Sequence, residues 1–162
     1  MQVVVHDSNT ADLEDVLREL GDLSGAEKCY PISFDPSDPE NVDLAIARIQ
    51  AEFHPVYIPT NNNAVISNTL IAETSFEDWR KSFSQNVDSA FLVARALLPA
   101  MRKRKWGRIV NTCSLAGKTG GITTGIAYST TKGPLQKPTF ALARVVAKDG
   151  ITVNGIAPAY IR

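Results

Sequence analysis

Tyr128 and Lys132 are the two residues in this chain whose types and spacing most directly suggest chemistry. They lie four positions apart in a stretch with helical periodicity, so their side chains share one face of the predicted helix. A lysine ammonium close to a phenol stabilises the phenolate, which makes a tyrosine a usable acid or base near neutral pH. The pair also fits a helix-surface contact without function, because this spacing arises by chance roughly one time in five.

Three further polar residues occupy positions that suit a binding site. Ser114 follows a predicted strand, and the carboxyl ends of parallel strands are where α/β sheets bind ligands. Asp7 also follows a predicted strand, at a place where a carboxylate can hold a nucleotide ribose. Asn86 lies within an apolar helical stretch, where a buried amide needs partners. The structural alternatives are a strand-end cap, a helix-start carboxylate and a satisfied helix kink.

The elements that must position these residues alternate between strands and helices. Short apolar segments predict strands at 2–6, 28–33, 56–60, 107–113 and 151–157. Helical spacing of apolar residues predicts helices at about 13–20, 39–53, 75–101 and 127–148. Such alternation implies right-handed crossovers and a mostly parallel sheet. We therefore predict one α/β domain over residues 1–162, a doubly wound sheet with helices on both faces.

Composition excludes several classes of protein. The chain has 162 residues, 44% apolar and 21% charged, as a globular domain should. Its formal net charge of +0 argues against a nucleic-acid partner. The absence of a long apolar run argues against membrane insertion, and the N-terminus does not resemble a signal peptide. Cys29 and Cys113 lack metal-ligand spacing, so we expect no metal site and a reducing cytoplasmic location.

Seven segments in order resemble the motifs of one family, the short-chain dehydrogenase/reductase family, and in particular its 3-oxoacyl-ACP-reductase-like members. These segments are 3–7, 34–38, 62–65, 86–91, 107–114, 128–132 and 150–158. The resemblance implies a Rossmann-like fold and hydride transfer between NAD(P) and an alcohol or carbonyl substrate.

The same resemblance implies catalytic roles by position. Tyr128 would be the general acid/base, and Lys132 would assist it and hold the nicotinamide ribose. Ser114 would hydrogen-bond the substrate oxygen as charge develops on it. Asn86 would order a water of the proton relay near Lys132.

The resemblance further implies a set of cofactor-binding residues. They are Asp7, Asp35, Pro36, Asn62, Ala64, Tyr128, Lys132, Pro158, Ala159 and Ile161. Asp35 and Pro36 would flank the adenine, and the last three would line the nicotinamide. Asp7 has no arginine after it, which favours NAD over NADP, because a carboxylate accepts ribose hydroxyls and repels a 2′-phosphate.

The sequence also departs from the family pattern. The family's first strand and its glycine-rich turn, TGxxxGxG, have no counterpart here, nor have its C-terminal lid and last strand. We therefore expect weakened cofactor binding, and unpaired strand edges that invite association. Val65 and Ala159 replace family glycines, and Pro59, Pro134 and Pro138 fall inside predicted elements.

Two interpretations follow for the function. In the first, the chain is an oxidoreductase acting on a small alcohol or carbonyl compound, assembled as a homo-oligomer through its two long helices. In the second, it is a catalytically silent relative that acts, if at all, as a non-enzymatic subunit of an oligomer.

Overall fold

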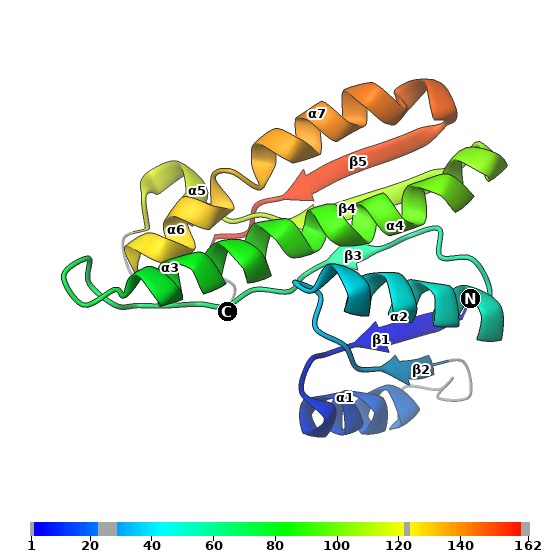
Figure 1. Ribbon diagram of the computed structural model, residues 1–162, viewed down its shortest axis with the longest axis horizontal. Coiled ribbons are helices and arrows are strands. Elements are labelled where there is room, and N and C mark those ends of the chain that lie inside the picture. The colour runs from blue at the N-terminus through cyan, green and yellow to red at the C-terminus, as the bar shows by residue number, and fades with distance from the viewer. Residues whose placement is uncertain (1, 23–28, 122–123, 160–162) are drawn as a thin grey trace.

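Two parallel sheets form the framework of the protein (Figure 1). The computed structural model describes residues 2–22, 29–121 and 124–159. Strand β1 (Val3–His6) pairs with β2 (Cys29–Ile32). Strand β4 (Gly107–Thr112) lies between β3 (Thr60–Asn61) and β5 (Ile151–Ile156). No pairing joins β1 to β3 within the described residues, so a gap persists where the family pattern places its first strand.

Helices connect the strands in the predicted order. Their bounds are α1 (Thr10–Asp22), α2 (Pro39–Glu52), α3 (Phe76–Phe83), α4 (Ser89–Arg104), α5 (Ala116–Thr119), α6 (Ile126–Lys132) and α7 (Gln136–Val146). A π-helical turn, η2 (Ser84–Asp88), joins α3 to α4, and a 3-10 turn, η3 (Ala147–Asp149), follows α7. None of the described helices is long and apolar enough to cross a membrane.

One apolar core links the two sheets. Helices α2, α4 and α7 contribute Val42, Leu97 and Val146 to it, and the strands contribute Ile32 and Ile109. Helix α1 contacts β1 and β2 but adds nothing to this core, so it packs on the opposite face. The fold is the predicted α/β class, and the first sheet has helices on both faces. On β5, alternate residues are exposed, so the outer face of β5 lacks a helical cover in the described part of the chain.

Strand β1 is less buried than its apolar sequence predicts. Val3, Val4 and Val5 are all half-buried, although a run of this kind is typical of a fully buried parallel strand. The edge of β1 that faces away from β2 is unpaired within the described residues. A lack of neighbours on that side explains the partial exposure.

The predicted strand at 56–60 is mostly wrong, because β3 covers only Thr60–Asn61. The carbonyls of Tyr57 and Pro59 do accept hydrogen bonds from Arg108 and Val110 of β4 (2.8 and 3.0 Å). In a parallel strand the N–H and C=O of one residue point the same way, so Pro59 also turns its ring nitrogen toward β4. Its missing N–H removes one bond of the ladder, which shortens the regular strand.

The predicted helix at 75–101 begins as expected but is not one continuous α-helix. The hydroxyl of Ser75 caps it by accepting from the Asp78 N–H. In η2 the Ser89 N–H donates to the Ser84 carbonyl five residues earlier, which is the π-helical pattern. The apolar pattern of this stretch predicts that Phe91 shares the buried face of Ala90, but Phe91 projects about 100° around the helix from Ala90 and is 59% exposed.

The predicted helix at 127–148 is divided in two. Helix α6 ends at Lys132, and α7 begins at Gln136, because Pro134 cannot donate the next helical hydrogen bond. Pro138 lies in the first turn of α7, where the N–H has no helical partner in any case. The break leaves Lys132 as the last residue of its helix.

Candidate active site

Lys132 is among the largest fully buried side chains in the protein, with 1% of its surface exposed. Its Nζ donates to the Thr112 carbonyl at the carboxyl end of β4 (2.7 Å). Burial lowers the pKa of Lys132 below its ordinary value, and the nearby Cys113 thiol offsets part of this effect. Burial in turn raises the pKa of Cys113. A buried lysine with a single main-chain acceptor is costly, and such groups concentrate at functional sites.

Tyr128 lies one turn before Lys132 on α6. The Lys132 Nζ is 5.7 Å from the centroid of the Tyr128 ring, so the predicted pairing on one helix face is present. Ser114 follows β4, and its Oγ accepts from the Ala116 N–H (3.1 Å) at the start of α5. The next N–H, of Leu115, donates to the Pro158 carbonyl (3.0 Å) beyond β5. The end of β4 supplies Ser114 and helix α6 supplies Tyr128 and Lys132 to one region.

Gly117 holds α5 close to the backbone of Lys132. A β-carbon added at Gly117 would lie 2.5 Å from the Lys132 carbonyl carbon and 2.6 Å from the Gly133 nitrogen. No side chain fits at that distance, so glycine is required for this approach. The glycine-rich stretch after Ser114 therefore has a packing role beside the lysine.

Asn86 is fully buried in η2, and its amide is satisfied by hydrogen bonds. Its Oδ1 accepts from the Val65 N–H (2.7 Å), and its Nδ2 donates to the Val65 carbonyl (3.0 Å). The same nitrogen donates to Thr131 Oγ1 (2.9 Å) on α6. The side chain thus ties the loop after β3 to the residue before Lys132. Its predicted role in a proton relay remains a prediction.

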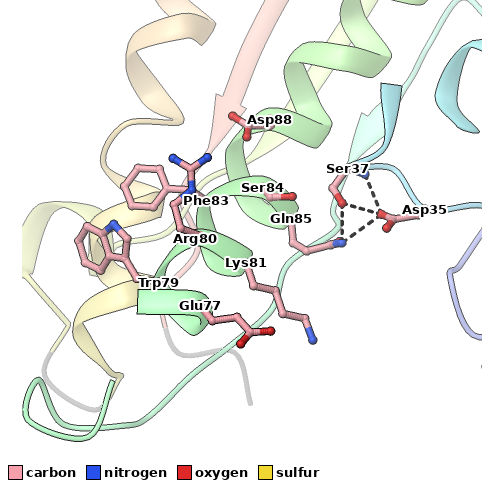
Figure 2. Close-up of a pocket in the computed structure, with 10 residues that line it drawn as sticks. All are labelled: Asp35, Ser37, Glu77, Trp79, Arg80, Lys81, Phe83, Ser84, Gln85 and Asp88. Atoms are coloured by element: carbon pink, nitrogen blue, oxygen red, sulfur yellow. Dashed lines mark hydrogen bonds between the residues drawn. The ribbon is translucent and has the colours of Figure 1, made fainter. Parts of the chain in front are cut away.

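Asp35 follows β2 and forms a polar cluster with Ser37 and Gln85 (Figure 2). Its Oδ1 accepts from the Ser37 N–H (2.9 Å), the Ser37 hydroxyl (2.7 Å) and Gln85 Nε2 (3.0 Å). Partial burial raises the pKa of Asp35, but these donors together hold it below its ordinary value. The carboxylate is therefore fixed in its charged form by neutral donors.

An open pocket of about 700 Å³ lies beside this cluster. It is lined by Asp35, Ser37 and Gln85, and by the α3 residues Arg80 and Lys81 among others (Figure 2). Ser114, Tyr128 and Lys132 do not line it. This pocket thus adjoins the predicted adenine end of the site and not the predicted catalytic end.

The other predicted cofactor residues lie at strand ends. Asp7 follows β1 and accepts from the Asn9 N–H (2.8 Å) in an Asx turn, and Pro36 is buried beside Asp35. Asn62 and Ala159 are exposed. Ala64 and Pro158 are half-buried, and Ile161 lies outside the described residues.

Sequence reasoning missed four polar residues that organise this region. Asn61 Nδ2 donates to Asn111 Oδ1 on β4 (2.8 Å). Thr131 is the partner of Asn86, and Gln85 is the partner of Asp35. The two consecutive amides, Gln85 and Asn86, in an apolar helix were the available signal for Gln85. The sequence around Asn111 and Thr131 contains no comparable signal.

The sequence and the fold match a known family. The short chain dehydrogenase pattern matches residues 1–162. Nodulation protein G of Azospirillum brasilense is 37% identical over 136 residues, covering 83% of this chain and 54% of that protein. The 3-oxoacyl-(acyl-carrier-protein) reductase FabG of Escherichia coli is 33% identical over 153 residues, covering 94% of this chain and 62% of that protein.

A solved structure gives the same result. The L-sorbose reductase of Gluconobacter frateurii, complexed with NADPH and L-sorbose, superposes with a TM-score of 0.88 at 29% identity. The match covers 97% of this chain and 59% of that one. The chain belongs to the short-chain dehydrogenase family. It spans somewhat more than half the length of the relatives it matches.

Proposed function

We propose that this chain is the core of an NAD(P)-dependent oxidoreductase that interconverts an alcohol and a carbonyl compound. The observation that carries the proposal is Lys132, fully buried and bound to the Thr112 carbonyl beside Ser114 and Tyr128. Replacing a buried lysine with an apolar side chain would relieve its desolvation cost. We attribute its presence to chemistry at this strand edge.

The roles of the side chains follow from their hydrogen-bonding capacity. The Tyr128 hydroxyl donates a proton to the substrate oxygen during carbonyl reduction and accepts it during alcohol oxidation. The Lys132 ammonium, whose Nζ is 5.7 Å from the Tyr128 ring centroid, stabilises the phenolate that remains. The Ser114 hydroxyl donates to the substrate oxygen as negative charge develops. Asn86 holds α6 in place through Thr131, with a proton-relay water near Lys132 as its further proposed role.

The cofactor would lie across the carboxyl ends of the strands. NAD(P)H supplies the hydride when bound. The polar groups that fit it are the carboxylates of Asp7 and Asp35 and the Lys132 ammonium, which has donors beyond its bond to Thr112. Pro36, Asn62, Ala64, Pro158, Ala159 and Ile161 complete the proposed set. Asp7 supports NAD as the preferred cofactor, while the similar L-sorbose reductase was solved with NADPH.

Calorimetry with NADH and NADPH on the purified chain tests this proposal. We expect micromolar binding of NADH that is weakened at least tenfold in Asp7→Ala and in Lys132→Ala. Lys137→Ala, an exposed lysine on α7, is the matched control and keeps wild-type affinity. Absence of binding by the folded wild-type chain at millimolar cofactor contradicts the proposal. It would favour the catalytically silent interpretation instead.

We also propose that the chain forms a homo-oligomer in the reducing cytoplasm. Exposed apolar side chains on its long helices support this assembly: Phe91 on α4, and Phe140 and Val145 on α7, which are 59%, 70% and 52% exposed. Both cysteines are unpaired. Sedimentation velocity should show a smaller species for Phe91→Asp, whereas Leu44→Asp, at an exposed apolar residue on α2, should sediment as wild type. A wild-type monomer at all concentrations would contradict the assembly.

A further inference from the structure

The Gln85 side chain uses every hydrogen-bonding group of its amide. Its Nε2 donates to Asp35 Oδ1 (3.0 Å) and to Ser37 Oγ (2.9 Å). Its Oε1 accepts from Asn63 Nδ2 (2.9 Å), which also donates to the Gln85 main-chain carbonyl (2.9 Å). A carboxylate only accepts, so the Gln85 nitrogen must face Asp35 and its oxygen must face Asn63. The amide therefore joins two loops in one fixed orientation.

The two loops belong to different sheets. Asp35 and Ser37 follow β2 of the two-stranded sheet, and Asn63 follows β3 of the three-stranded sheet. Strands β1 and β3 are not paired with each other within the described residues. At the carboxyl ends of the strands, Gln85 thus bridges a boundary that no described strand pairing crosses.

The π-helical turn is what allows this bridge. Consecutive residues of an α-helix project about 100° apart, and only every third or fourth residue returns to the same side. Within η2, Gln85 contacts Asp35 and Asn63, and Asn86 contacts Val65 and Thr131. π-Helical turns are frequent at functional sites.

We propose that Gln85 is a positioning residue for the adenosine half of the nucleotide cofactor. It fixes the Asp35 carboxylate and the Asn63 turn at the separation that the adenosine needs. All three donors to Asp35 bind the same oxygen, Oδ1, and Oδ2 has no partner among the described residues. That oxygen remains available to an adenosine amine or hydroxyl. This inference rests on the proposed cofactor function of the site.

The test divides the cofactor into its halves and measures the affinity of each. The probes are AMP and nicotinamide mononucleotide, titrated by calorimetry into wild type and Gln85→Met, which keeps the side-chain length and removes the amide. We expect the AMP dissociation constant to rise about five- to twentyfold. The constant for nicotinamide mononucleotide should change less than twofold. Gln50→Met is the matched control, since Gln50 on α2 makes no side-chain hydrogen bond within the described residues.

A second variant distinguishes positioning from general loosening of the fold. Gln85→Glu keeps the shape but places a carboxylate against Asp35, so it should weaken AMP binding more than Gln85→Met does. Amide hydrogen exchange should increase at 35–38 and 63–65 in both variants, and remain as in wild type at β4 and β5.

Each outcome bears on a stated claim. Faster exchange with unchanged AMP affinity overturns the positioning role and leaves Gln85 as a structural residue only. Equal losses of AMP and nicotinamide mononucleotide affinity also overturn it. If wild type binds neither probe and no NADH, the proposed function fails and this inference fails with it. If wild type binds both probes and Gln85→Met binds them equally well, this inference fails alone.

Discussion

The carboxyl ends of the two sheets are organised by different means. At the three-stranded sheet, main-chain carbonyls accept the hydrogen bonds beside the proposed catalytic residues: Cys113 N–H donates to the Ile156 carbonyl (2.8 Å), Leu115 N–H to the Pro158 carbonyl (3.0 Å), and Lys132 Nζ to the Thr112 carbonyl (2.7 Å). At the two-stranded sheet, Asp35 is held by donors from Ser37 and Gln85, two of which are side chains. A main-chain carbonyl therefore holds Lys132, whereas the proposed cofactor carboxylate depends on the Gln85 side chain for one of its three donors.

Burial follows the same division. Ile109 and Ile151 of the three-stranded sheet are almost completely buried, while the three valines of β1 are half-buried. The first sheet gains stability chiefly through the shared core beneath α2 and α4. Burial of the strands therefore decreases from β4 toward β1.

The largest expected effect is on catalysis at the three-stranded sheet. Tyr128→Phe removes the hydroxyl that transfers the proton, and we expect the rate of carbonyl reduction to fall about 10²- to 10⁴-fold. NADH affinity should fall far less than the rate, because the ring and the Lys132 ammonium are retained. Steady-state oxidation of NADH with a panel of small ketones and aldehydes measures the rate. An undiminished rate in the variant would remove Tyr128 from the mechanism.

The difference in burial predicts unequal losses of stability. Ile109→Ala should lower the free energy of unfolding by about 2–5 kcal/mol, because it leaves a cavity in the core. Val5→Ala removes a half-buried side chain and should cost about 1 kcal/mol. Urea unfolding of both variants at one pH gives the comparison. Equal losses would show that β1 is packed as tightly as β4.

Gly117→Ala probes the contact between α5 and Lys132. The added methyl would lie 2.5 Å from the Lys132 carbonyl carbon, so α5 must move, at a cost of about 1–3 kcal/mol. Thermal unfolding measures the loss, and Lys118→Ala, an exposed neighbour on α5, is the control. Because the clash is with backbone next to the lysine, NADH affinity should fall as well. A variant with wild-type melting temperature would contradict the close approach.

Lys132 should make stability depend on alkaline pH. Its pKa in the folded chain is lowered by burial, so between that value and about 10.4 the unfolded chain binds a proton that the folded chain does not. Stability from this group therefore rises with pH across that window. Urea midpoints of wild type and Lys132→Met, measured from neutral pH up to about 10.4, should converge or cross as pH rises, with Lys132→Met relatively more stable at the lower pH. A constant difference would contradict the effect of burial.

The smallest expected effect concerns Asp35. Its pKa in the folded chain is lowered, so its contribution to stability is present above about 3.9 and is lost as pH falls through the folded pKa. Asp35→Asn lacks this contribution. Acid unfolding followed by circular dichroism should therefore be shallower for Asp35→Asn than for wild type. Identical curves would show that the donors from Ser37 and Gln85 do not stabilise the charged form.

Much of the fold was predictable from local patterns. The order of strands and helices, the Asp38 and Ser75 caps and the shared face of Tyr128 and Lys132 all depend on residues close in sequence. The end of α6 was not predicted, although Pro134 was visible, because helical periodicity continues across the break. Strand β3 is shortened because the ring nitrogen of Pro59 faces β4. The sequence alone does not show which backbone groups of a strand face its neighbour.

The candidate site was predictable only in part, for a similar reason. Residues that belong to a recognisable motif, such as Ser114 and Lys132, were identified from the sequence as candidate site residues. Gln85 and Thr131 act through partners about 50 positions away or on another helix, and nothing in their immediate neighbours indicates those contacts. Phe91 is apolar yet 59% exposed, because it projects about 100° around the helix from the buried Ala90.

The π-helical turn also has a consequence for insertions and deletions in this chain. Removal of one residue between Ser84 and Asp88 would leave enough chain for an ordinary α-helix from α3 to α4. The helix would then be more regular, yet α3 would be rotated by about 100° relative to α4. Trp79 and Phe83 would turn to a new side, and only one of the two adjacent amides could keep its partners. A single-residue deletion that makes this helix more regular would thus break the contacts that join the two loops. We therefore expect the helix to tolerate substitutions more readily than a change in its length.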